Sequence, residues 1–237
     1  MIISWFSCGI DSAVATTLAL RQYDDVRIIY IANDSEHPDN FRFIEECRKF
    51  WNHDIEVFRS SKFKSQWEVI RAKRFINSPG GAPCTKILKK EVRWYIEDTC
   101  QWDGQVFGFD ADEAKRAERF SEQNPKCKAL FPLIKEGFTK AECMAIWAKT
   151  GIPQPAMYRL GFPNNNCIGC VKGGKGYWSR IRHYFPEAYQ KMMDIEKELG
   201  VTCINGFALK ELPSNYPMSN PIVPSCSLFC DPDFLTI

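Results

Sequence analysis

The chain contains 237 residues, 45% of them hydrophobic, and carries a formal net charge of +2 at pH 7. This length suits one large domain or a domain with an appendage, and the small net charge excludes a global polyanion-binding character. No apolar stretch approaches the length of a membrane span, and the N-terminal residues lack the basic segment of a secretion signal. Eleven cysteines in such a chain favour reduced thiols, metal ligation or thiol chemistry over a disulfide framework, so we expect a cytoplasmic protein that contacts no membrane.

Strand and helix patterns alternate along the first half of the chain. The strand candidates lie at 1–6, 26–32, 54–58 and 105–108. The helical patterns lie at 13–20, 39–51, 66–76, 85–99 and 113–123. This alternation predicts an α/β fold, in which a parallel twisted sheet carries helices on both faces.

The pattern changes after about residue 133. A helix with Thr139 as its N-cap is predicted over 139–150, and a stretch rich in proline, glycine and asparagine follows it. A helix pair near 178–200 and a tail rich in proline and serine complete the chain. We therefore expect two units, an α/β domain over 1–135 and a small helical, cysteine-containing region with a tail over 136–237.

The turn Ser-Cys-Gly-Ile-Asp-Ser over residues 7–12 joins the first strand to the first helix. Backbone N–H groups and the positive end of the helix dipole make such a turn a natural seat for phosphate. Gly9 permits close approach of a ligand, Ser7 and Ser12 add hydroxyl donors, and Asp11 or Ser12 can cap the helix. The turn predicts that a nucleotide is bound by its phosphates, although similar turns also occur in α/β proteins without a ligand.

Other candidate binding residues follow the predicted strands. Asn33 and Asp34 come directly after the strand that ends at Ala32, and Gly108 closes the short strand near 105. In parallel sheets ligands bind beyond the carboxyl ends of the strands, so we expect these positions to converge with the turn over 7–12.

A Cys-x-x-Cys sequence at Cys167 and Cys170 is the main feature of the second half. Two thiolates at this spacing grip one metal ion or act as a redox pair, and a pair of inert loop thiols is the alternative. The motif lies between an asparagine-rich and a glycine-rich stretch and does not open a helix directly after a strand. This position favours metal binding over dithiol catalysis.

Further cysteines supply candidate ligands. Cys84 lies in a turn just before a predicted helix, where the helix dipole lowers a thiol pKa. Cys226 is a candidate near the end of the chain, with Cys203 and Cys230 as alternatives, and three or four thiolates suit zinc and an iron–sulfur cluster equally well. We interpret Cys8 as a small loop residue, and the thiols within helical patterns as packing residues, namely Cys47, Cys100 and Cys143.

The turn over 7–12 resembles the PP-loop, Ser-x-Gly-x-Asp-Ser, of the adenine-nucleotide α-hydrolases, with Ile10 where many members have lysine. Four later motifs follow in the order found in the phosphoadenylylsulfate (PAPS) reductase family, and the resemblance covers about residues 1–185. These motifs are FPLI at 131–134, GIPQP at 151–155, YRLGF at 158–162 and CIGC at 167–170.

Some positions depart from the family pattern. Asp110 stands where the family usually has an arginine, Cys84 has no adjacent cysteine, and the tail lacks the motif that carries the reductase's catalytic cysteine. The chain is therefore most similar to divergent bacterial and phage members with a cysteine cluster, including the DNA phosphorothioation protein with its ATP-pyrophosphatase domain.

The resemblance implies an enzyme that cleaves ATP at the α-phosphate, releases pyrophosphate and adenylylates an acceptor, with Mg²⁺ held largely by phosphates and waters. It implies nucleotide binding by Ser7, Cys8, Gly9, Asp11, Ser12, Ala32, Asn33, Asp34, Gly108 and Arg116. The catalytic residues among them are expected to be Ser7, Asp11 and Ser12. An iron–sulfur cluster linked to sulfur transfer, with zinc as the alternative, would be held by Cys84, Cys167, Cys170 and Cys226.

Two other functions remain open at this point. One is reduction of PAPS or adenylylsulfate with a thioredoxin-like reductant. The other is an accessory protein with a structural zinc that binds a nucleotide or nucleic acid, because a basic and aromatic cluster over 172–184 either contacts phosphates and bases or forms one face of an amphipathic helix. The expected partners are an adenine nucleotide, a nucleic-acid or small-molecule acceptor and a sulfur donor, and an oligomer is compatible with the sequence. Candidate stabilising cations, or alternatively solvated helix charges, are Lys86, Arg116 and Arg119.

Overall fold

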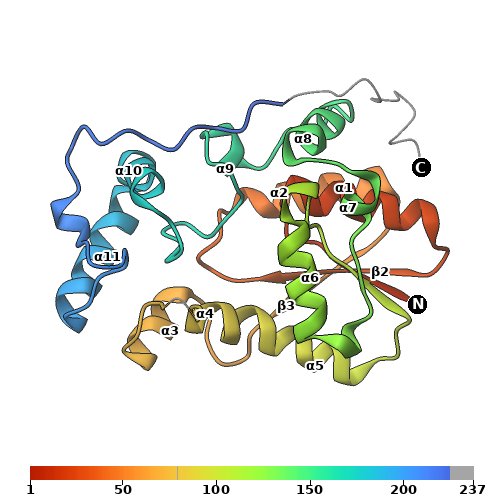
Figure 1. Cartoon of the computed structure of the whole chain (residues 1–237), viewed down its shortest axis with the longest axis horizontal. Helices are drawn as coiled ribbons and strands as arrows, with labels where there is room; N and C mark the ends of the chain where they lie inside the picture. The colour runs from red at the N-terminus through yellow and green to blue at the C-terminus, as the bar shows by residue number, and fades with distance from the viewer. Residues whose placement is uncertain (79, 225–237) are drawn as a thin grey trace.

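The centre of the protein is a five-stranded sheet, all parallel, seen in a computed structural model that describes residues 1–78 and 80–224 (Figure 1). The strand order is β3-β2-β1-β4-β5, which confirms the predicted α/β fold. The strands are β1 (Ile2–Trp5), β2 (Val26–Ala32), β3 (Ile55–Arg59), β4 (Gly104–Val106) and β5 (Ala129–Leu130). The two-residue strand β5 was not predicted, because so short a pairing leaves no periodic pattern in the sequence.

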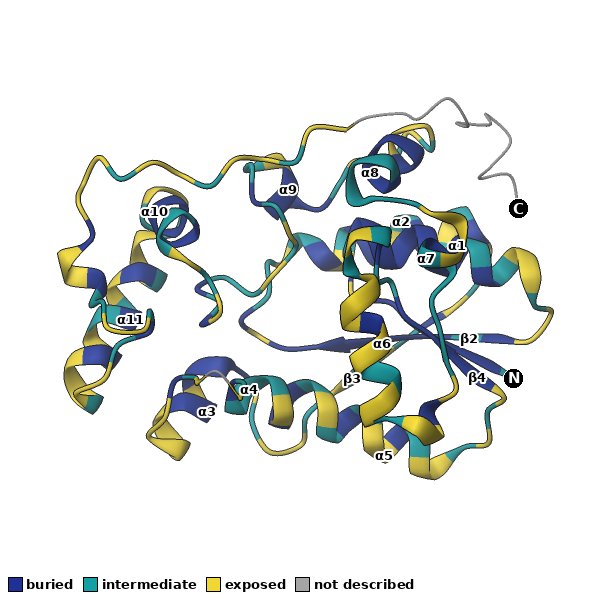
Figure 2. Cartoon of the chain, in the orientation of Figure 1, coloured by how far each residue is buried: buried dark blue, intermediate teal, exposed yellow. Residues whose placement is uncertain are grey.

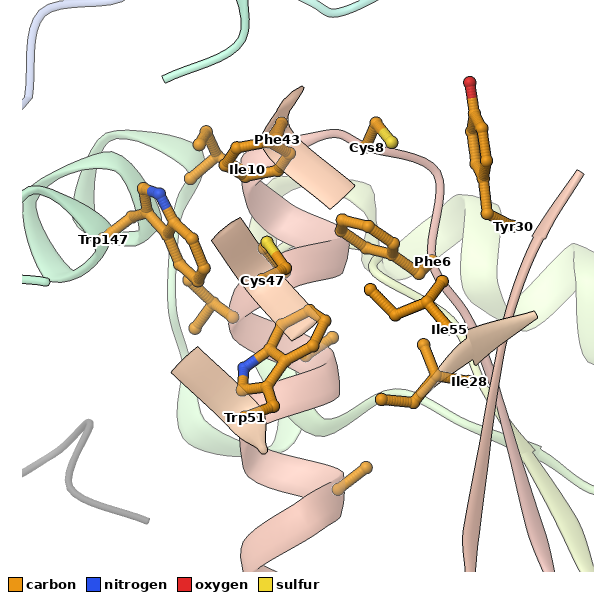
Figure 3. Packing of buried hydrophobic residues seen from close by; sticks show 14 of the residues in the cluster. Phe6, Cys8, Ile10, Ile28, Tyr30, Phe43, Cys47, Trp51, Ile55 and Trp147 are labelled. Carbon is orange, nitrogen blue, oxygen red and sulfur yellow. The ribbon is translucent and has the colours of Figure 1, made fainter. Parts of the chain in front are cut away.

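Alternate residues of the central strands pack against helices on opposite faces of the sheet, as the two-residue period of a strand requires. Ile28 and Tyr30 of β2 belong to the main core, together with residues of α1 (Ile10–Gln22) and α2 (Asp39–Trp51) (Figure 3). Their neighbours Ile29 and Ile31 turn to the other face and pack against α5 (Glu91–Thr99). Both faces are therefore covered, and β2 is dark blue along most of its length in Figure 2.

The lower layer in Figure 1 contains α3 (Gln66–Lys73) and one continuous helical run that ends with α5. That run begins as α4 (Pro83–Thr85) and widens into a π-helical turn, η1 (Lys86–Lys90), where the sequence predicted an ordinary helix over 85–99. Such a turn shifts the direction of the side chains that follow it, and π turns often lie at functional sites. The elements after β4 are η2 (Ala111–Glu113), α6 (Ala114–Gln123), η3 (Pro125–Cys127) and α7 (Pro132–Glu136).

Helix α8 (Lys140–Ala148) begins at the predicted N-cap. The Thr139 side chain accepts a hydrogen bond from the Glu142 N–H, and the Glu142 carboxylate accepts one from the Thr139 N–H, which forms a capping box. Trp147 of α8 is fully buried and packs edge-on against Phe43 of α2. The remaining helices are α9 (Ala156–Arg159), α10 (Lys175–Tyr184), α11 (Pro186–Leu199) and η4 (Leu209–Glu211).

A second hydrophobic cluster joins α3 to the C-terminal helices. Trp67 and Ile70 of α3 pack with Trp178 of α10 and Met192 of α11, which are both completely buried. Helix α8, by contrast, shares the main core with α1 and α2. The two clusters thus cross the boundary that was expected near residue 135, and that boundary remains a prediction.

Within the described ranges, no helix is both long enough and apolar enough to span a bilayer.

Candidate functional site

The strand order reverses at β1, whose neighbours β2 and β4 lead to opposite edges of the sheet. The segments that leave β1 and β4 meet at this point, which is where open parallel sheets bind ligands. Gly108 follows β4 and lies against the start of α1, so that a Cβ here would be 2.6 Å from the backbone N and Cα of Ser12. Gly108 is therefore a packing residue beneath the loop over 7–12, and it lets the two segments approach closely.

The Ser12 hydroxyl determines the shape of that loop. It accepts hydrogen bonds from the Ser7 N–H and the Ser7 hydroxyl, both at 3.0 Å, and donates one of 2.8 Å to the Gly9 carbonyl. Cys8 between them has a positive φ of 58° and a fully buried side chain, as expected for a small loop residue. Ser7 remains exposed at the rim of the loop.

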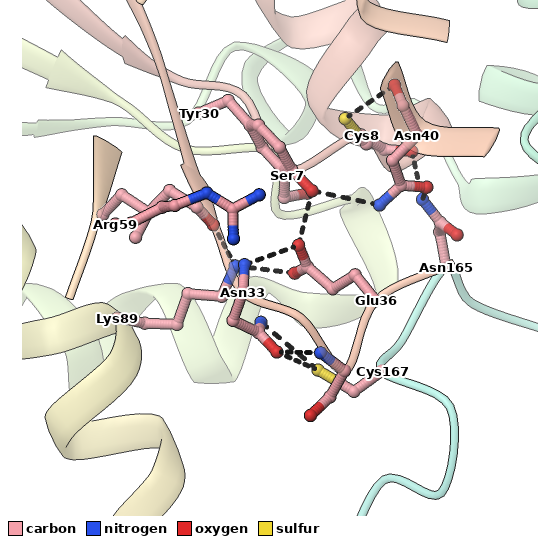
Figure 4. Close-up of polar contacts among 12 residues, drawn as sticks. Ser7, Cys8, Tyr30, Asn33, Glu36, Asn40, Arg59, Lys89, Asn165 and Cys167 are labelled. Atoms are coloured by element: carbon pink, nitrogen blue, oxygen red, sulfur yellow. Dashed lines mark hydrogen bonds and ion pairs between the residues drawn. The ribbon is translucent and has the colours of Figure 1, made fainter. Parts of the chain in front are cut away.

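Residues of the C-terminal half support the loop from outside. The Tyr158 hydroxyl accepts a hydrogen bond of 3.3 Å from the Ile10 N–H, and burial raises the pKa of Tyr158 to about 12, so the phenol is neutral near pH 7. The Asn165 amide donates to the Cys8 carbonyl and to Asn40 Oδ1, both at 2.8 Å (Figure 4). The segment around 158–165 therefore supports the loop in its observed shape.

Asp11 faces Lys140 rather than the solvent. Its Oδ2 atom lies 2.6 Å from the Lys140 Nζ atom, which also donates a hydrogen bond of 2.7 Å to Asn164. Asp11 Oδ1 is buried and accepts no hydrogen bond from any described residue. Burial raises the pKa of Asp11, and the Lys140 charge opposes that rise. Lys140 also brings a positive charge to a loop that has isoleucine at position 10.

A cavity of about 460 Å³ opens beside this loop, beyond the carboxyl ends of β1 and β2. Ile29, Ile31 and Phe107 form an apolar part of its lining. Six of the predicted site residues line it as well, namely Ser7, Asn33, Cys84, Arg116, Cys167 and Cys170. The nucleotide-binding candidates and the thiols, which are up to 163 positions apart from Ser7 to Cys170, thus share one cavity.

Other predicted residues support the cavity without lining it. Asp34 forms an ion pair of 2.5 Å with Arg59, and Ala32 is buried at the end of β2. Asp110 is also buried and caps η2 by accepting a hydrogen bond of 3.0 Å from the Asp112 N–H. Among the described residues, the predicted site residues outside the lining are Cys8, Gly9, Asp11, Ser12, Ala32, Asp34 and Gly108.

The Cys-x-x-Cys loop is held in place by hydrogen bonds to three elements. The Tyr177 hydroxyl accepts one of 2.8 Å from the Cys170 N–H and donates one of 2.6 Å to the Cys167 carbonyl. The Gln66 amide donates to the Ile168 and Gly169 carbonyls, and the Asn33 amide lies 3.6 Å from the Cys167 sulfur (Figure 4). Gly169 has a φ of +76°, which favours glycine.

The thiols of the cavity are protonated near neutral pH. Burial raises the pKa of the Cys167 thiol to about 12, with the Glu36 carboxylate adding to the effect. Burial also raises the pKa of Cys170 and of Cys84. The prediction of a lowered pKa at Cys84 was wrong, because the desolvation of the thiol outweighs its hydrogen bonds to Thr85.

In the described part of the chain, no three cysteine, histidine, aspartate or glutamate side chains are arranged to hold a metal ion. Cys203 is buried behind the cavity lining, with its sulfur 3.6 Å from the carbonyl of the lining residue Val171. Its pKa is raised first by burial and then by the nearby Glu196, Cys170 and Cys84. The predicted ligand Cys226 and its alternative Cys230 lie outside the described residues.

Several residues of the site are not among the predicted site residues. Lys89 Nζ lies 2.6 Å from Glu36 Oε1 and also donates to the Ile31 carbonyl, while the Tyr30 hydroxyl donates to Glu36 (Figure 4). Lys89 and Glu36 line the cavity together with Gln66. Glu36 follows a predicted strand and Lys89 lies close to Cys84 in the sequence, so both positions carried a signal, but no local pattern indicated that the two side chains pair.

The basic and aromatic cluster over 172–184 is largely structural. Arg180 is buried and donates a hydrogen bond of 2.8 Å to the Leu160 carbonyl, and Arg182 donates one of 2.8 Å to the Leu212 carbonyl. Tyr177 and Trp178 are buried in the second hydrophobic cluster. These four residues therefore contact other parts of the protein in this structure. Cys47 and Cys143 are likewise fully buried packing residues, as predicted.

Residues 1–175 match the protein family described as the phosphoadenosine phosphosulfate reductase domain. The uncharacterized protein MJ0973 of Methanocaldococcus jannaschii is 26% identical over 223 residues, which cover 88% of this chain and 51% of that protein. The uncharacterized protein MJ0066 of the same organism is 22% identical over 202 residues, covering 81% of this chain and 41% of that protein. The chain thus spans about half the length of the curated relatives that it matches, or less.

Proposed function

Because the chain belongs to the phosphoadenosine phosphosulfate reductase domain family, we propose that it binds an adenine nucleotide in the cavity beyond β1 and β2 and acts on its α-phosphate. A single observation carries this proposal. Ser7 of the loop over 7–12, which we call the phosphate-type loop, lines the same cavity as the three thiols Cys84, Cys167 and Cys170, although these residues come from three distant parts of the sequence.

The lining is suited to a nucleotide. Ile29, Ile31 and Phe107 offer apolar contacts for a base, while Arg116 and Lys172 offer charged hydrogen-bond donors for phosphates. Mg²⁺ would be held mainly by phosphates and waters, because Asp11 is paired with Lys140 and Glu36 is paired with Lys89. ATP fits this set of donors, and PAPS is the alternative nucleotide.

The proposed reaction is adenylyl transfer. A nucleophilic oxygen of the acceptor forms a bond to the α-phosphorus of ATP, the bond to the bridging oxygen breaks, and pyrophosphate leaves with that electron pair. Arg116 and Lys172, two exposed cations of the lining, can stabilise the negative charge on the phosphates during this step. The remaining contribution of the chain is to position the nucleotide against the acceptor.

The three cavity thiols Cys84, Cys167 and Cys170, which we call the thiol wall, are suited to a soft metal by their donor type. Thiolates ligate both iron–sulfur clusters and zinc. We propose Cys84, Cys167 and Cys170 as ligands that metal binding would draw together, since the three thiols are not arranged for a metal in this structure. Cys226 is the proposed fourth ligand, with Cys203 and Cys230 as its alternatives. A bound iron–sulfur cluster would supply sulfur transfer to the adenylylated acceptor, and zinc would be structural. Since the thiols are protonated without a metal, metal binding would release protons and strengthen as the pH rises.

The nucleotide proposal is tested by measuring ATP binding by calorimetry and pyrophosphate release with Arg116→Ala. We expect binding to weaken about tenfold, because the substitution removes charge-assisted hydrogen bonds to phosphate. Lys115→Ala is the matched control, since Lys115 is exposed on the same helix and lines no part of the cavity. Equal ATP binding by both variants and the wild-type protein would contradict the proposal.

The reaction and the metal are distinguished on one anaerobic preparation. Pyrophosphate formed from ATP supports adenylyl transfer, whereas sulfite formed from PAPS together with no pyrophosphate from ATP supports the reductase. Iron and sulfide with broad absorbance near about 400 nm indicate a cluster. Zinc without iron would make the thiol wall structural and would remove the link to sulfur transfer.

A further inference from the structure

A second and larger hollow, of about 930 Å³, lies next to the nucleotide cavity. We call it the outer groove, and it runs between α6 and the helical segment over 83–94. The two hollows share five residues of their linings, Thr85, Lys90, Phe107, Arg116 and Lys172. A ligand that lies along the outer groove therefore reaches the rim of the cavity that contains Cys84 and the other thiols.

The outer groove is positively charged. Its lining includes five cations and, among the described residues, no aspartate or glutamate. Four of these cations are exposed and form no salt bridge within the described ranges, and they are Lys86, Lys90, Arg119 and Lys172. The fifth, Arg116, is paired with Glu113 just outside the lining. Unpaired cations at such density attract a polyanion.

The outer groove also contains exposed aromatic rings. Phe75 and Trp94 are 43% and 40% exposed, which is unusual for such large apolar side chains. At the rim shared with the nucleotide cavity, the Arg116 guanidinium lies over the Phe109 ring, 4.3 Å from its centroid. Flat rings and guanidinium planes between unpaired cations are the features by which proteins stack bases and hold the phosphates between them.

We propose that the outer groove binds a single-stranded segment of nucleic acid. Phe75 and Trp94 would stack its bases, and Lys86, Lys90 and Arg119 would contact its phosphates. An acidic protein surface would pair with these cations, but it would offer no flat partner for the exposed rings of Phe75 and Trp94. A duplex keeps its bases stacked inside, so it cannot offer them to the rings.

The position of the outer groove identifies the bound strand as the acceptor, an inference that rests on the proposed adenylyl transfer. A strand held by Lys86 and Trp94 passes the shared rim at Arg116 and Lys172 and reaches the nucleotide cavity. Lys172 is thus the member of the cluster over 172–184 that faces both hollows. The binding surface itself does not depend on which atom of the strand reacts.

The test is fluorescence anisotropy of the whole chain with labelled single-stranded DNA and RNA, over a series of salt concentrations. The variants are Lys86→Glu/Arg119→Glu and, separately, Trp94→Ala, because all three residues line the outer groove and not the nucleotide cavity. We expect the double variant to weaken binding at least tenfold and to reduce the salt dependence by roughly 0.7 per lost phosphate contact. Trp94→Ala should weaken binding about tenfold at every salt concentration.

Two matched controls separate charge and ring effects from general damage. Lys197→Glu/Lys210→Glu makes the same charge change at exposed positions outside both hollows, and Tyr95→Ala removes an exposed ring that follows Trp94 but lines neither hollow. Both controls should bind the strand like the wild-type protein. Unchanged binding by the groove variants, or duplex binding as tight as single-strand binding, would overturn the proposal.

Calorimetry with ATP keeps the two proposals apart. The groove variants should bind ATP like the wild-type protein while they lose the oligonucleotide, which supports a separate strand-binding surface. If the wild-type protein binds the oligonucleotide but not ATP, the proposed function is overturned, and the proposal that the outer groove binds a single strand is still supported. Loss of ATP binding in the groove variants would overturn the assignment of a separate surface.

Discussion

At the scale of single residues, Ser12 and Gly108 act on the phosphate-type loop from beneath. Ser12 closes the loop through three hydrogen bonds, and Gly108 supplies the space in which Ser12 lies. Neither residue lines the 460 Å³ cavity, whereas Ser7 does. Within the loop, Ser7 therefore contacts the cavity, and Ser12 holds Ser7 in position.

Ser12→Ala tests this division of roles. The substitution removes the hydrogen bonds that position Ser7, so we expect ATP affinity to fall about tenfold and the free energy of unfolding to fall by about 1 kcal/mol. Calorimetry and chemical denaturation measure the two effects. Ser61→Ala, at an exposed serine outside the cavity, should change neither quantity. ATP affinity equal to wild type in Ser12→Ala would show that the loop does not depend on this hydroxyl.

At the scale of elements, the first residue of α2 links that helix to the start of α9. The Asp39 carboxylate accepts hydrogen bonds from Arg42 Nε at 2.7 Å and from the Ala156 N–H at 2.8 Å, and Arg159 lies 3.4 Å away. The Arg42 hydrogen bonds lower the pKa of Asp39 most, and the Ala156 N–H and the Arg159 charge lower it further. This residue connects the sheet domain to the segment that carries Tyr158.

The lowered pKa makes the contribution of Asp39 depend on pH. Its stabilisation is present above the unfolded pKa of 3.8 and is lost as the pH falls through the lower folded value. We expect Asp39→Asn to reduce the free energy of unfolding by about 1 kcal/mol at pH 7, after allowance for solvent screening. The difference from wild type should shrink as the pH falls below 3.8.

Denaturant unfolding at a series of pH values measures this difference. Asp98→Asn is the control, because Asp98 is exposed on α5 and forms no salt bridge with the described residues. A difference between Asp39→Asn and wild type that stays constant from pH 7 to pH 3 would rule out the charged contacts as its source.

At the scale of the whole molecule, the cavity is built from both halves of the chain. The Ile168 N–H donates a hydrogen bond of 2.7 Å to the Ser35 carbonyl, and Asn165 reaches back to the Cys8 carbonyl. The loop over 7–12 and the Cys-x-x-Cys loop are thus parts of one hydrogen-bonded assembly, although about 160 positions separate Ser7 from Cys167. A ligand in the cavity would stabilise both loops together.

Hydrogen exchange with mass spectrometry tests this coupling. Saturating ATP should slow amide exchange in residues 7–12 and in residues 165–171 to a similar extent, because both segments border the cavity and open only when it opens. Helix α11 lies outside the cavity lining and serves as the internal control. Protection confined to residues 7–12 would contradict the shared assembly.

The sequence by itself determined the layout of the sheet domain. Strand β2 and helix α2 were predicted with the bounds that the structure shows, because a run of β-branched residues and a helical repeat of apolar residues each demand one kind of burial. The capping box at Thr139 was equally local, since its hydrogen bonds join residues three positions apart. The loop over 7–12 and the Cys-x-x-Cys pair were recognisable for the same reason.

Only the tertiary structure decided how these pieces combine. The meeting of Ser7 with Cys84 and Cys167, the pairing of Lys140 with Asp11 and the outer groove all join residues that are distant in the sequence. Burial also reversed the local expectation at Cys84, because desolvation of a thiol depends on what packs over it and not on its neighbours in the chain. Periodicity and capping report on contacts within a few residues, whereas a binding site depends on long-range packing.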